Sequence, residues 1–146
     1  MADINIIETI GMALLWLVIG IGISMLLVKF YDFFIFRKFD LQEAIEKRNI
    51  AVSIFFGLML LGIGLVVGAT IISPGAGSLL YDIVLTIGWS IATSLVATLF
   101  FFGFDKLLVP KVELQEEISN NNIASGIFSG ILYVAVSVVA MAVIMT

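Results

Sequence analysis

The chain has 146 residues and a mean hydropathy of +1.22; 62% of its residues are hydrophobic and 12% charged, and its 7 basic and 11 acidic residues leave a net charge of −4. Soluble domains carry about 25% charged residues. A water-soluble fold of this size is excluded, because it could not bury so much apolar surface. The absence of cysteine also excludes disulfides and thiolate metal sites.

Four apolar segments are long enough to cross a bilayer, which takes about 20 residues. They cover residues 6–28, 50–72, 83–104 and 123–145. Buried helices of a large soluble protein are the alternative, but the chain has too few amphipathic helices to cover four such cores. A cleaved signal peptide is the other interpretation of the first segment, yet no basic residue precedes it. The sequence therefore predicts an all-α integral membrane protein with four transmembrane helices.

The basic residues lie in the two longer connections between these segments. Positive charge favours the cytoplasmic side of a membrane. We therefore expect both long loops in the cytoplasm and both termini outside. The basic residues are Lys29, Arg37, Lys38, Lys47 and Arg48 in the first connection, and Lys106 and Lys111 in the second.

The second half of the chain repeats the first at a shift of 73 residues. Ten positions between 41 and 57 have identical partners in the second half, and Trp16 matches Trp89. The repeat predicts two tandem helical hairpins, residues 1–73 and 74–146. Each hairpin crosses the membrane twice, so both enter it in the same direction. This excludes inverted repeats, although parallel repeats also occur in transporters.

Acidic residues recur at the edges of the two hairpins. Asp40 and Glu43, like Glu113 and Glu116, are three residues apart, a spacing that predicts helix starts running into the membrane with capped N–H groups. We expect Asp32 to be a solvated or salt-bridged acid with Arg37, Lys38 or Arg48 as its partner. For Asp105, the expected partner is Lys106. A cation or polyamine contact near a pore mouth is the alternative. The boundary acids that we single out are Asp32, Glu43, Asp105 and Glu116.

Small residues at intervals of four form one face on each of the second and fourth predicted helices. Such faces let a neighbouring helix approach closely, and an asparagine at the shallow end can hydrogen-bond across the contact. We interpret them as helix-packing or oligomer contacts; a ligand role for the asparagines is the alternative. The residues are Asn49, Ser53, Gly57, Gly64 and Gly68 in the first half, and Asn122, Gly126 and Gly130 in the second.

The two halves differ in a hydroxyl stripe on the third predicted helix. It consists of Thr86, Ser90, Ser94 and Thr98, whereas the equivalent positions of the first helix are Ala13, Leu17, Ile21 and Met25. Hydroxyls can line a narrow wet path, but they also bond to their own helix and fill tight interfaces. We favour packing and keep a pore lining as the alternative, since the stripe has no ionisable residue at its centre.

The same inventory bears on other functions. Proton relays usually place an acid, histidine or lysine within a span, and here the charges lie near the boundaries. The chain has no histidine, no cysteine and no phosphate-binding loop. We therefore expect that the protein is not an enzyme and that it binds no metal or cofactor. Without a basic domain, we expect no nucleic-acid partner.

A doubled motif carries a resemblance to a known family. Asn-x-Ala, five residues and Gly occur after an acidic helix at Asn49, Ala51 and Gly57, and again at Asn122, Ala124 and Gly130. In these motifs, and over nearly the whole chain, the protein resembles the YjfL-type bacterial inner-membrane family, domain of unknown function 350. It departs from the family by carrying Arg48 before the first asparagine. The resemblance implies an inner-membrane location, this architecture and a membrane-complex partner; it assigns no activity.

These observations predict a lipid-embedded subunit that acts by assembling, as a homo-oligomeric scaffold, with or without a larger partner. The runner-up is a small channel or transporter. Its path would run through the oligomer and be lined by the hydroxyls of the third helix.

Overall fold

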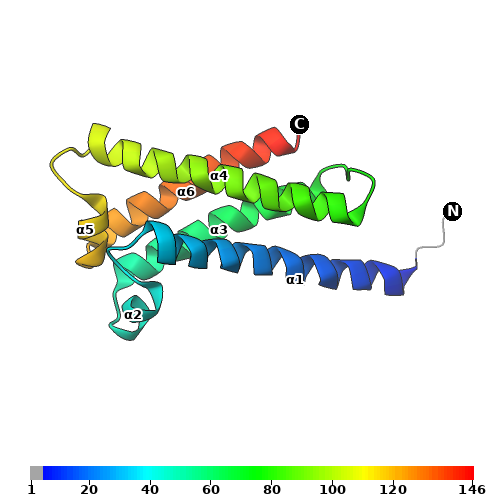
Figure 1. Ribbon diagram of the computed structural model, residues 1–146, viewed down its shortest axis with the longest axis horizontal. Coiled ribbons are helices and arrows are strands. Elements are labelled where there is room, and N and C mark those ends of the chain that lie inside the picture. Colours follow the sequence, from blue (N-terminus) through cyan, green and yellow to red (C-terminus); the bar gives the residue numbers. More distant parts are fainter. Residues whose placement is uncertain (1–4) are drawn as a thin grey trace.

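The computed structural model describes residues 5–146, which are helical apart from short connections (Figure 1). Four long helices are apolar enough to cross a membrane, so the chain is a multi-pass membrane protein. Two short helices precede the second and fourth of them. The elements are α1 (Ile6–Phe30), η1 (Tyr31–Ile35), α2 (Leu41–Glu46), α3 (Ile50–Ile72), α4 (Leu79–Leu107), α5 (Leu114–Ser119) and α6 (Ile123–Ile144).

Each long helix begins at a polar side chain that accepts a backbone N–H of the first turn. The capping residues are Asn5, Asn49, Ser78 and Asn122, types that are preferred at this position because the first N–H groups of a helix lack partners. The third crossing therefore starts at Leu79, earlier than the predicted 83. The first crossing runs past the predicted 28, because α1 continues into the π-helical turn η1.

The predicted helix starts at the paired acids are wrong in two respects. Glu113 makes no side-chain cap bond to α5, and the helices that the acids begin are not the ones that cross the membrane. Asp40 does cap a helix, accepting the Glu43 N–H at 2.9 Å, but that helix is the separate α2, which ends before α3 begins. The chain turns between them through Arg48, with φ at 58°, and turns between α5 and α6 through Asn121, with φ at 64°. Asn49 is thus the N-cap of α3 and does not lie on its face.

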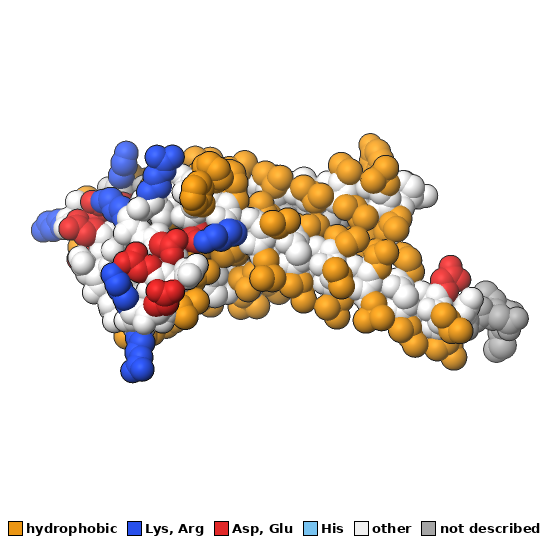
Figure 2. All heavy atoms as spheres, turned by 60° about the horizontal axis from the view of Figure 1, so that its bottom comes forward, with side chains coloured by type: hydrophobic (Ala, Val, Ile, Leu, Met, Phe, Trp, Pro, Cys, Tyr) orange, Lys and Arg blue, Asp and Glu red, His pale blue; other side chains and the backbone are white. Residues whose placement is uncertain are grey.

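The short helices α2 and α5 lie at one end of the molecule, and both described ends of the chain lie toward the other (Figure 1). Helices α3 and α6 start at the first end and run in parallel, and α1 and α4 run the opposite way. Charged side chains gather around the short helices, whereas hydrophobic side chains cover the long helices (Figure 2). This distribution matches one polar boundary and a lipid-facing body.

Helices α3 and α6 form the centre of the bundle, and α1 lies along one edge (Figure 1). An added Cβ at Gly62 of α3 would lie 3.2 Å from the carbonyl oxygen of Tyr133, and one at Gly126 of α6 would lie 2.5 Å from that of Ala51. Glycine is therefore required at Gly126, and the contact at Gly62 is tight. Next to this contact, Phe36 from the chain after η1 is fully buried against Phe55 and other aromatic rings.

Candidate functional site

The hydroxyl stripe of α4 lies inside the subunit. The exposed fractions of Thr86, Ser90, Ser94 and Thr98 are 0%, 1%, 2% and 7%. Three of the four bond to hydroxyls of other elements: Thr86 to Thr70 of α3 at 2.9 Å, Ser94 to Tyr31 of η1 at 3.0 Å, and Thr98 to Tyr133 of α6 at 2.7 Å. The stripe therefore ties α4 to the other helices of its own chain.

Two buried hydroxyls stand apart from these pairs. Within the described residues, Ser90 Oγ and Ser129 Oγ have no hydrogen-bond partner. An unpaired polar atom in a dry interior is costly, and an ordered water is its usual partner. Any wet path along the stripe would have to run through the subunit, because the side chains do not face a neighbouring copy.

The two small-residue faces have different surroundings. On α6, an added Cβ at Gly126 or Gly130 would collide with α3 at 2.5 Å. On α3, an added Cβ at Gly57, Gly64 or Gly68 would meet nothing within 4 Å. These three glycines instead line a groove of about 710 Å³ between α1 and α3. The small-residue face on α6 packs against α3 of the same chain, and the equivalent face on α3 is open.

The asparagines at the helix starts join the two halves of the chain. Asn49 caps α3 and donates from Nδ2 to the carbonyl oxygen of Ser119 at 2.9 Å. Its counterpart Asn122 donates to the Glu117 carboxylate of its own half. The crossing bond from the second half comes from Asn121, whose Oδ1 accepts the Ala51 N–H at 3.0 Å. The role of Asn121 was not predicted from the sequence. The available signal was its alignment with Arg48, the residue by which the chain departs from the family.

The boundary acid Asp32 has a structural role. Its side chain is fully buried; Oδ1 accepts the Leu41 N–H at 2.9 Å, and Oδ2 pairs with Lys29 Nζ at 2.8 Å. The expected partners Arg37, Lys38 and Arg48 were therefore wrong. Lys29 lies one helical turn earlier and reaches the carboxylate because α1 continues to residue 30.

The other boundary acids lie nearer the surface. Asp105 accepts the Leu114 N–H at 2.9 Å, and Lys106 forms no ion pair with it among the described residues. Glu43 pairs with Lys47, and this hydrogen bond raises the pKa of Lys47. Glu116 is exposed. The four acids therefore do not converge on one site.

Several backbone and capping interactions recur at the shift of 73 residues. The bond from Leu41 N–H to Asp32 matches the bond from Leu114 N–H to Asp105. The backbone bond from Asn49 to Ala44 matches that from Asn122 to Glu117. Between the halves, Lys38 pairs with Glu113, a hydrogen bond that raises the pKa of Lys38.

Two apolar grooves lie between pairs of long helices. One is the groove between α1 and α3. The other, of about 510 Å³, lies between α4 and α6 and is lined by Phe104, Val136 and Val143 among others. No group of three or more His, Cys, Asp or Glu side chains that could hold a metal occurs in residues 5–146.

Comparison with known proteins places these features in a family context. The model of the family described as Domain of Unknown Function (DUF350) matches residues 5–144. A UPF0719 transmembrane protein of Aquifex aeolicus (strain VF5) is 24% identical over 125 residues, which are 86% of this chain and 47% of that protein. The chain thus spans about half the length of this curated relative. No solved structure matched.

Proposed function

Because the chain belongs to the DUF350 family, whose description leaves its activity open, we propose that it acts as a homo-oligomeric scaffold subunit of a bacterial inner-membrane assembly. The open face of α3 carries this proposal. An added Cβ at Gly57, Gly64 or Gly68 would meet nothing within 4 Å, whereas the equivalent face of α6 is in tight contact. Small-residue faces drive helix association in membranes because they let backbones approach. The proposal includes no catalysis.

Helix α1 supports this proposal from the other side of the groove. Its buried residues are Gly20, Ser24 and Val28, all on one face. Along the rest of the helix, large apolar side chains such as Leu17 and Ile21 are more than half exposed. Lipid can cover these side chains, but it fills a glycine-lined groove less closely than a helix does.

Native mass spectrometry in a mild detergent tests the assembly. We expect one dominant oligomer at several protein concentrations, because a specific interface fixes the number of subunits. Size-exclusion chromatography with light scattering in a second detergent serves as the control. A stable monomer in both detergents would overturn the proposal.

The positive charges favour an orientation with α2 and α5 in the cytoplasm. Single cysteines at Lys47 and Lys111 should then react with a membrane-impermeant reagent only after the cells are opened. A cysteine at Ala76, in the connection at the opposite end of the molecule, should react in intact cells. Labelling of residues 47 and 111 from opposite sides would contradict the orientation.

A small channel or transporter is the second candidate, and the unpartnered Ser90 hydroxyl is the observation that favours it. Water bound there would continue the line of hydroxyls along α4. Flux of ions, polyamines and small solutes into liposomes tests this candidate, with Ser90→Ala as the variant and Gly88→Ala on the same helix as its control. Flux that is absent, or unchanged in Ser90→Ala, would remove it.

A further inference from the structure

The contact between the two halves of the chain is built from two different surfaces. The first half contributes surface I, which we define as Tyr31, Leu58, Gly62 and Thr70. The second half contributes surface II, defined as Ser94, Gly130, Ser137 and Thr86, whose members contact those of surface I in that order. Each half therefore uses only one of the two surfaces in this contact.

The shift of 73 residues locates the unused equivalents. On the second half, surface I corresponds to Phe104, Ile131, Ala135 and Val143, which we call surface I′. On the first half, surface II corresponds to Ile21, Gly57, Gly64 and Ala13, which we call surface II′. Three members of surface I′ line the groove between α4 and α6, and three members of surface II′ line the groove between α1 and α3.

Both unused surfaces are open and apolar. Ile131 and Val143 are 54% and 56% exposed, and Ile21 is 53% exposed. An added Cβ at Gly57 or Gly64 would meet nothing within 4 Å, so a neighbouring helix has room to approach there. At Gly130, the corresponding space is already filled by Leu58. The two open grooves thus correspond to the two surfaces that meet inside the chain, and both are unused in the single copy.

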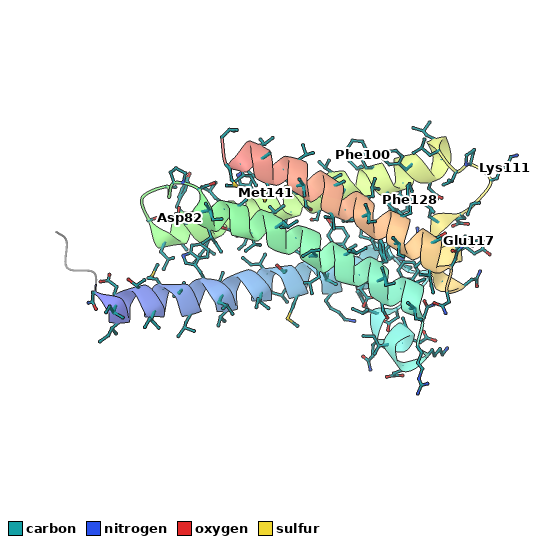
Figure 3. All side chains as sticks on the ribbon, turned by 180° about the vertical axis from the view of Figure 1, so that it is seen from behind. Asp82, Phe100, Lys111, Glu117, Phe128 and Met141 are labelled. Atoms are coloured by element: carbon teal, nitrogen blue, oxygen red, sulfur yellow. The ribbon has the colours of Figure 1, made fainter. Side chains whose placement is uncertain are left out.

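The charges at the polar end follow the same pattern. Lys38 of the first half pairs with Glu113 of the second. The equivalent residues are Lys111 and Asp40. Both are exposed, and Lys111 extends from the connection between α4 and α5, away from the bundle (Figure 3). A contact between surfaces I′ and II′ would bring these opposite charges together.

We propose that surface I′ of one copy binds surface II′ of a second copy, head to tail, and that this is the interface of the proposed homo-oligomer. The inference rests on the proposed function. Because both hairpins enter from the same end (Figure 1), a second copy with the same membrane orientation presents surface II′ the right way up. The two surfaces on each copy are different, so the interface is heterologous, and it forms a ring where the rotation between copies closes.

Disulfide cross-linking tests the interface directly, since the chain has no native cysteine. The hydrogen-bonded pair Thr70 and Thr86 corresponds to Val143 and Ala13. We would co-express one copy with Ala13→Cys and a differently tagged copy with Val143→Cys in native membranes. A mild oxidant should link the two tags, because bridged Cβ atoms must lie within about 4.5 Å.

The matched control replaces Val143→Cys with Ala142→Cys, an exposed neighbour at the same depth but about 100° around the helix. This pair should not link. If native mass spectrometry shows an oligomer but the 13/143 pair does not link, or links no better than the control, the interface is overturned and the proposed function stands. A monomer in both detergents overturns both.

A second variant tests the interface without cysteine. Gly57→Leu places a large side chain where the single chain has open space, so the fold should tolerate it while the second copy is displaced. We expect the dissociation constant of the oligomer to rise at least about tenfold. Gly88→Leu is the control, since Gly88 has equally open surroundings and lies outside both grooves. Equal effects of the two variants would overturn the interface.

Discussion

The close approach of α3 and α6 makes a quantitative prediction at Gly126. In Gly126→Ala, the new Cβ would lie 2.5 Å from the carbonyl oxygen and 2.9 Å from the Cα of Ala51. Both atoms belong to the backbone, so no side-chain rotation can relieve the overlap. Overpacking of this kind costs about 1–3 kcal/mol. Alanine offsets about 0.5–1 kcal/mol of this by its better helix propensity.

We therefore expect Gly126→Ala to lower the free energy of unfolding by up to about 2.5 kcal/mol. Equilibrium unfolding by sodium dodecyl sulfate in mixed micelles, followed by tryptophan fluorescence and circular dichroism, measures it. Gly88→Ala gains the same propensity in open surroundings and should be neutral or stabilising. If Gly126→Ala is as stable as Gly88→Ala, the tight α3–α6 contact is refuted.

Four further changes can be measured by the same unfolding assay. Arg48→Gly should raise the free energy of unfolding by about 1 kcal/mol, because the φ of 58° strains a residue with a side chain; a loss would contradict this reason. Asp32→Ala should lower the free energy of unfolding by about 1–3 kcal/mol, since the substitution leaves the Leu41 N–H without its acceptor. Asp40→Ala removes an exposed helix cap and should lower the free energy of unfolding by about 1 kcal/mol. Tyr133→Phe should cost only about 0.6–2 kcal/mol, because Thr98 keeps its bond to a backbone carbonyl.

The sequence predicted the spans well because each is a long apolar run bounded by polar caps. The pattern of apolar and polar residues could not separate α2 from α3. The turn between them depends on a positive φ at Arg48, and arginine rarely adopts one. The sequence had marked that residue as unusual without giving the reason. It also could not show that Asp32 turns inward to Lys29, because five basic residues lie in the same connection of the linear chain.

The small-residue faces show a different limit. Their spacing predicted close helix contacts on both α3 and α6, but the two faces are chemically similar, so no pattern could assign one to the chain itself and leave the other open. That assignment depends on which side of α3 receives α6. At the polar end, the bonds of Asn49 and Asn121 join the two hairpins.

The divergence of α1 from α4 follows from the same difference in surroundings. Inside the chain, Thr86 and Ser94 of the α4 stripe bond to Thr70 and Tyr31. The equivalent stripe on α1 meets lipid in a single copy, where an unpaired hydroxyl is costly and hydrocarbon is not. Ala13 and Ile21 are accordingly hydrocarbon where Thr86 and Ser94 carry hydroxyls. The proposed contact between copies must then rely on close packing over glycine rather than on side-chain hydrogen bonds. This makes it weaker than the contact inside the chain and sensitive to any side chain added at Gly57.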